Sequence, residues 1–202
     1  KSCDLIFGLS TAGAILSKSV LGLFPLTIVG AFLIFSRQWK EIINLWFLSG
    51  CMIALLLGFS WHIINWQHYG QGFINAHFGS LIINRSFGGA KEPFYFLGYA
   101  KDFLRNYWPW LPFTLIGLSQ FGKQGFFREK DRTALLLFLW PALIFLVMST
   151  SKNQTLRYLF IMFPALAIIT AKTISGWLGP EKKNLSLGIM ASIIAITILF
   201  VN

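Results

Sequence analysis

The chain has 202 residues, of which 55% are hydrophobic and only 12% are charged, and its mean hydropathy is +0.65. Soluble domains carry about twice that share of charge, so the composition excludes an ordinary water-soluble protein and indicates a membrane protein. The net charge of +10 would suggest a nucleic-acid partner in a soluble protein. Here the cations fall in short stretches between apolar runs, which is typical of membrane topology, so we expect no nucleic acid.

Seven apolar segments follow one another along the chain. We predict that each is a helix, because lipid offers no hydrogen-bond partner to an unpaired backbone group. The chain is therefore expected to be an all-α, polytopic integral membrane bundle with about seven transmembrane helices, forming one domain over residues 1–202. The segments are residues 5–17, 20–35, 42–64, 111–121, 133–148, 158–174 and 185–201.

The first two segments are separated only by Lys18 and Ser19. A charge between two apolar helices is costly to keep near lipid, so Lys18 is a candidate functional residue. A lysine at a tight interfacial turn, whose ammonium reaches the lipid headgroups, explains the pattern equally well. The residue types alone leave both interpretations open.

A polar, aromatic-rich stretch at residues 61–110 stands between the third and fourth segments. Tryptophan and tyrosine gather at both of its ends, where amphipathic rings lie at the headgroup level of a bilayer. We therefore predict a long amphipathic outer loop, residues 65–108, on the membrane surface. This loop offers a site beside the lipid for an anionic partner, such as the phosphate of a lipid-linked substrate. Its cations are Arg85, Lys91, Lys101 and Arg105, and its carboxylates are Glu92 and Asp102.

Assigning the polar stretches to alternate sides of a membrane leaves ten of the 17 lysines and arginines on one side and seven on the other. The ten lie in compact loops, so we place that side in the cytoplasm. The outer side then holds seven cations and only two carboxylates. Membrane topology does not explain this outer excess of positive charge, so we expect it to serve a function.

Two outer stretches carry residue types that bind phosphate. Arg85 is soon followed by two glycines, and a guanidinium binds phosphate with two hydrogen bonds where glycines let the backbone approach. Lys152, Arg157 and Tyr158 lie within seven residues and together suit a phosphate or pyrophosphate. Headgroup pairing for Arg85, and membrane-edge anchoring for the second group, are the structural alternatives.

Acids and histidines give weaker signals. Transfer of a sugar to a hydroxyl needs a base, for which Glu92 is a candidate, whereas Asp102 is placed to pair with Arg105 on a short helix. The histidines share no metal-ligand spacing, and we interpret them as interfacial residues rather than ligands. They are His62, His68 and His77.

Several short motifs, taken in order, resemble the later part of a GT-C glycosyltransferase. This class uses polyprenyl-phosphate sugars, and the similarity is to the lipid A aminoarabinose transferases and the bacterial relatives of protein O-mannosyltransferases. It covers most of residues 12–175. The motifs are the turn at residues 16–23, Trp61, residues 69–73, 84–87, 92–97 and 108–110, Lys152 after Ser151, and residues 156–159 and 163–167.

The resemblance implies a glycosyltransferase in a bacterial inner membrane. Its active site would lie on the outer, periplasmic face, and it would transfer a sugar from a polyprenyl-phosphate donor to a hydroxyl of a lipid, protein or glycan acceptor. The implied contacts to the donor are Lys18, Arg85, Lys152, Arg157, Tyr158 and Tyr95.

The catalytic carboxylate of this class is an aspartate in the first outer loop, so we expect it upstream of residue 1 in a longer polytopic protein. Glu92 is the candidate base within the chain. Some relatives place a metal-binding histidine shortly before the arginine that matches Arg85, where this chain has Ile82 and Ile83. A divalent metal is possible in the family, but we identify no ligands for it in this chain, and we assign no other cofactor.

The main alternative is a transporter or flippase for an anionic lipid or solute, with the same cations along its path. Transporters commonly show internal repeats or helices broken at mid-membrane, whereas the charges here lie at the ends of apolar segments. A non-catalytic structural subunit is a third possibility, for which the outer cations would not matter.

Overall fold

Helices make up the regular structure in the part of the chain that the computed structural model describes. This confirms the prediction of an all-α protein for the described residues, which are 2–84, 96–123, 132–151 and 156–177 with Gly188 and Ala191. The chain divides into two compact units, which are Lys1–Pro93 with Ser151–Asn153 and Phe94–Thr150 with Gln154–Asn202. The single domain expected over residues 1–202 stays a prediction.

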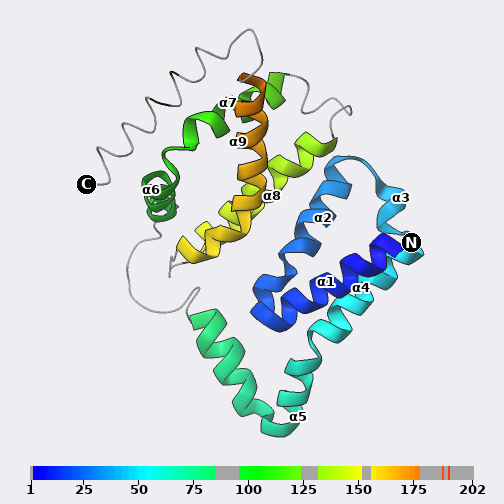
Figure 1. Ribbon diagram of the computed structural model, residues 1–202. Helices are drawn as coiled ribbons and strands as arrows, with labels where there is room; N and C mark the ends of the chain where they lie inside the picture. The colour runs from blue at the N-terminus through cyan, green and yellow to red at the C-terminus, as the bar shows by residue number, and fades with distance from the viewer. Residues whose placement is uncertain are drawn as a thin grey trace. The chain divides into compact units, whose positions relative to one another are not determined.

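The first unit begins with a long helix and contains one 3₁₀ segment and one π-helical segment (Figure 1). A proline lies in the first turn of α2 (Phe24–Phe35). At the start of α4 (Leu45–Gly58), the Asn44 side chain accepts a hydrogen bond of 3.1 Å from the Trp46 backbone N–H. In chain order the elements are α1 (Ser2–Lys18), η1 (Ser19–Leu23), α2 (Phe24–Phe35), α3 (Trp39–Ile42), α4 (Leu45–Gly58), α5 (Ser60–Ile74) and η2 (Asn75–Asn84).

The second unit has a short amphipathic helix followed by longer apolar helices. Its elements are α6 (Phe96–Tyr107), α7 (Leu111–Lys123), α8 (Arg132–Ser149), the 3₁₀ segment η3 (Leu156–Met162) and α9 (Phe163–Trp177).

Four helical runs in the described part of the chain are long and apolar enough to cross a membrane. The prediction of a membrane protein therefore agrees with the structure, while the number of seven spans stays a prediction. The 13-residue α7 is shorter than the about 20 residues that a straight span needs, and the predicted segment 185–201 lies outside the described residues apart from Gly188 and Ala191. The four runs are Ser2–Phe35, Leu45–Ser80, Arg132–Ser149 and Leu156–Gly176.

Helices α1 and α4 lie side by side in the first unit (Figure 1). They run in the same direction, since Gly50 of α4 lies against the backbone of Asp4 and Gly58 lies against Ile15, farther along α1. Along α4, Gly50, Ala54 and Gly58 recur every fourth residue and are all buried. Small residues at this spacing let two membrane helices approach closely, because association in lipid depends on van der Waals packing.

The predicted outer loop, residues 65–108, is helical where the structure describes it, in α5, η2 and α6. Of these helices, only a short one carrying Asp102 and Arg105 was predicted. In the first unit, α5 reverses at Gly70, which has φ +55° and ψ −139°. Figure 1 shows the two arms joined at a sharp turn. Helical hydrogen bonds within each arm satisfy the backbone of a segment that lies next to lipid, which an irregular loop does not achieve.

Replacing Gly70 with alanine is expected to destabilise this turn by about 1–3 kcal/mol, because residues with a Cβ rarely adopt such a backbone conformation. Gly72 is the matched control: a Cβ built on either glycine meets no atom within 4 Å, but only Gly70 has a positive φ. Thermal unfolding in detergent should show a lower melting temperature for Gly70→Ala and little change for Gly72→Ala. Equal melting temperatures of the two variants would contradict the conclusion that the turn at Gly70 requires glycine.

The core of the second unit lies between α8 and α9. Ala134 and Leu137 of α8 pack with Ala165 and Ile169 of α9, and all four are buried. The Trp140 indole donates a hydrogen bond of 3.0 Å to the carbonyl oxygen of Ile161, which ties η3 to α8.

Helix α6 packs by one face and exposes the other. Tyr99, Phe103 and Tyr107 recur every fourth residue, and the tyrosines are buried. The Tyr107 hydroxyl lies 2.9 Å from the Thr114 hydroxyl of α7 and 3.1 Å from the Thr170 hydroxyl of α9. This buried group of hydroxyls holds the end of α6 to both helices, as expected for an amphipathic helix at the edge of a membrane domain.

Candidate functional site

Lys18 is the last residue of α1 and is exposed. The helix stops there because Lys18 leaves helical geometry, with φ −131° and ψ 11°, and Ser19 follows with φ +53°. The break lies where the sequence predicted the end of the first segment. Lys18 makes no ion pair with another described residue, and a cation at a helix C-terminus is favoured by the helix dipole.

Ser19 connects this turn to the polar segment. Its hydroxyl oxygen lies 2.9 Å from Nε2 of His62 and 3.2 Å from Nε2 of His77. The two histidines come from the two arms of the turn at Gly70, in α5 and η2. We call Ser19, His62 and His77 the serine–histidine cluster. It brings the Lys18 turn and residues 60–84 together at one end of α1, in agreement with their assignment to the same side of the membrane.

The protons of the cluster follow from the chemistry of its groups. The Ser19 hydroxyl has a single proton, so it donates to one histidine and accepts an N–H from the other. His62 is 6% exposed, and its Nδ1 is buried without a hydrogen-bond partner among the described residues. An unpaired buried acceptor is less unfavourable than an unpaired N–H. The favoured arrangement therefore has His62 donating from Nε2 to Ser19, and Ser19 donating to His77.

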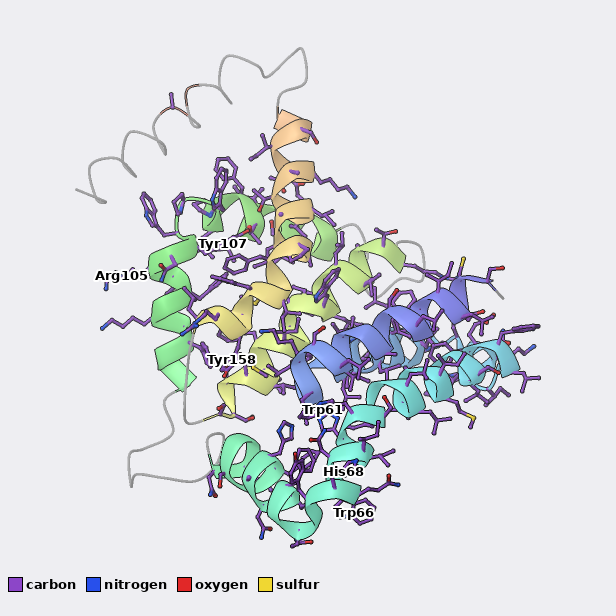
Figure 2. All side chains as sticks on the ribbon, turned by 60° about the horizontal axis from the view of Figure 1, so that its bottom comes forward. Trp61, Trp66, His68, Arg105, Tyr107 and Tyr158 are labelled. Carbon is purple, nitrogen blue, oxygen red and sulfur yellow. The ribbon has the colours of Figure 1, made fainter. Side chains whose placement is uncertain are left out.

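Aromatic rings surround the two histidines and hold their orientation. His77 stacks on Phe73 with ring centroids 5.2 Å apart, and Trp61 meets His77 edge-on at 5.7 Å. His62 lies 5.7 Å from Phe78, on the other arm. In Figure 2, Trp61 lies close to the end of α1, whereas Trp66 and His68 lie farther along α5. Such packing restricts the rotation of the imidazoles, so the cluster has a defined geometry.

The second unit contains two of the predicted donor contacts. Arg157 is exposed and Tyr158 is half-buried, both in η3. Helix α6 contacts η3, so this part of the predicted outer segment lies next to these residues, as the alternation of sides suggested. Arg105 is exposed on α6 and points away from the helices of its unit (Figure 2).

The remaining predicted site residues, Arg85, Glu92, Tyr95 and Lys152, lie outside the described residues. Their roles stay predictions. Lys18 belongs to the first unit, and Arg157 and Tyr158 belong to the second. Each of these donor contacts is therefore described within its own unit.

The serine–histidine cluster was missed by sequence reasoning. Ser19 was read as part of a turn, and the histidines were read as interfacial residues. His62 is instead buried and hydrogen-bonded, 43 residues from its partner. The one signal in the sequence was the concentration of polar residues immediately after an apolar segment, which indicates hydrogen bonding near lipid but not its partner.

Comparisons with known proteins place the chain near one relative of unknown role. An uncharacterized protein of Aquifex aeolicus (strain VF5) is 28% identical over 174 residues, which are 86% of this chain and 33% of that protein. The chain thus spans about a third of the length of this relative. No family model matches the chain. No solved structure matches it.

Proposed function

We propose that this chain is part of a membrane glycosyltransferase of the GT-C class. It would use a polyprenyl-phosphate sugar as donor and act at the outer face of a bacterial inner membrane. The observation that carries the proposal is the position of Lys18. An exposed ammonium without an ion-pair partner among the described residues ends an apolar helix beside a polar, aromatic helical turn. The phosphate of a lipid-linked donor lies at the same level, between lipid and water.

The proposed chemistry is a displacement at the sugar. An acceptor hydroxyl attacks the anomeric carbon, the bond from that carbon to the phosphate oxygen breaks, and the acceptor proton passes to a carboxylate base. Negative charge develops on the leaving phosphate, and cations held in place beforehand stabilise it. Lys18 would supply one of these cations.

The resemblance assigns further donor contacts. They are Arg85, Tyr95, Lys152, Arg157 and Tyr158, of which Arg157 is exposed at the surface of the second unit. Glu92 is the candidate base in this chain, and the resemblance places the main catalytic aspartate in a preceding loop. The acceptor is a hydroxyl of a lipid, protein or glycan.

A sided transfer assay tests the proposal. The intact natural protein in proteoliposomes would receive isotope-labelled polyprenyl-phosphate sugars, with lipid, peptide and glycan acceptors, and products would be identified by mass spectrometry. We expect label on an acceptor, and none when nucleotide sugars replace the lipid-linked donor. Movement of the donor between leaflets without transfer would instead establish a flippase. If neither transfer nor movement occurs with any donor, the proposed function is wrong.

A further inference from the structure

Ser19 holds a backbone conformation that needs support from its surroundings. A positive φ in a residue other than glycine, asparagine or aspartate costs about 1–2 kcal/mol, which contacts from neighbouring groups can offset. At Ser19, φ is +53°. The groups that bond its side chain are both histidines of the cluster. The turn that ends α1 is thus held from outside α1.

Both histidines are themselves held in place. The ring of His62 is buried against Phe59, with centroids 5.2 Å apart, and the rings of His62 and His77 lie 5.1 Å apart. The residues that carry them are joined through the turn at Gly70, so the two imidazoles reach Ser19 from two directions. Two hydrogen bonds with rigid rings define the position of the hydroxyl better than one.

We propose that the serine–histidine cluster positions Lys18 for the phosphate of the donor. Lys18 directly precedes Ser19, so a fixed Ser19 also fixes the position of the neighbouring Lys18 Cα, from which the lysine side chain leaves α1. A flexible four-carbon side chain loses entropy when its ammonium binds a phosphate, and a fixed starting point lowers that cost. His62 and His77 are positioning residues in this scheme, because they act through Ser19. This inference rests on the proposed function for the identity of the anion.

A double-mutant cycle separates positioning from general stabilisation. In the intact natural protein, Ser19→Ala and His62→Phe should each raise the KM for the polyprenyl-phosphate donor about tenfold, since each removes part of a hydrogen-bonded network. In a Lys18→Ala background, neither change should raise KM further. His62→Gln should restore most of the affinity, because its amide nitrogen replaces Nε2 as a donor. His68→Phe, at an exposed histidine of α5, is the control and should leave KM unchanged.

Hydrogen–deuterium exchange provides a readout that does not depend on activity. A peptide that covers residues 16–24 should exchange faster in Ser19→Ala and His62→Phe than in the wild type, and at the wild-type rate in His62→Gln and His68→Phe. Additive losses in the Lys18→Ala background would overturn the inference, because the cluster would then act independently of Lys18. Unchanged exchange in Ser19→Ala would also overturn it.

The two proposals fail in different ways. If the wild type transfers sugar but Ser19→Ala alters neither KM nor exchange, only the positioning role is wrong. If the wild type transfers no sugar while Ser19→Ala accelerates exchange at residues 16–24, the proposed function is wrong and the cluster still fixes the turn.

Discussion

Replacing Lys18 with glutamate is expected to reduce donor use by more than about 100-fold. The ammonium at the end of α1 would be exchanged for a carboxylate, and like charges brought together at a binding site cost several kcal/mol. Lys18→Ala removes one charge-assisted hydrogen bond and should raise the donor KM by about 10- to 100-fold. Lys18→Arg keeps the charge and should retain most of the activity. Initial rates of sugar transfer at varied donor concentration measure all three.

Lys40 provides the matched control for this series. It is an exposed lysine of α3 in the same unit, and it lies on the side assigned to the cytoplasm. Lys40→Glu changes the net charge by the same amount, so general repulsion of an anionic substrate would affect both variants. We expect Lys40→Glu to leave the donor KM unchanged. A wild-type KM in Lys18→Glu would remove Lys18 from the donor site.

A large loss of stability is expected from Gly50→Ala, because the added methyl group would meet backbone atoms that no side-chain rotation moves aside. The Cβ would press on the carbonyl oxygen of Asp4 and lie 3.1 Å from its carbonyl carbon. Overpacking of this kind typically costs about 1–3 kcal/mol, and here α1 must also move away from α4. The melting temperature in detergent should fall by several degrees.

Gly13→Ala tests whether this loss is specific to the contact between α1 and α4. Gly13 lies in α1, but a Cβ built there meets no atom within 4 Å. Alanine is the better helix former, so Gly13→Ala should leave stability unchanged or raise it slightly. If both variants melt at the same temperature, the close contact of α1 with α4 does not contribute to stability.

Local features of the fold could be predicted from the sequence, and contacts between distant residues could not. Apolar runs identified α1, α2, α4, α8 and α9, because lipid admits few other backbone structures. The polar residue pair at Lys18 and Ser19 marked the end of α1. The helices of residues 65–84 were missed because their polar side chains resemble those of a surface loop, although backbone hydrogen bonding next to lipid favours a helix.

In the candidate site, too, local features could be predicted and contacts between distant residues could not. Lys18 was predicted as a site residue because a charge between two apolar segments is costly to keep near lipid, and this is a local property of the sequence. His62 was not, because its burial depends on α1 lying beside α4 and on the reversal at Gly70. Neither of these is visible in the spacing of the histidines. Arg157 and Tyr158 were assigned from their residue types and from the resemblance, and the structure adds that α6 lies against the segment that carries them.

The parallel arrangement of α1 and α4 has a consequence for biosynthesis. A growing chain enters the membrane from its N-terminus, so α1 and α2 leave the ribosome before Gly50, Ala54 and Gly58 do. The two early helices must therefore be stable in lipid through their own hydrophobicity, and the close packing on α4 forms afterwards. His62 and His77 follow later still. Ser19 thus gains its hydrogen bonds only when the nascent chain has extended past residue 77.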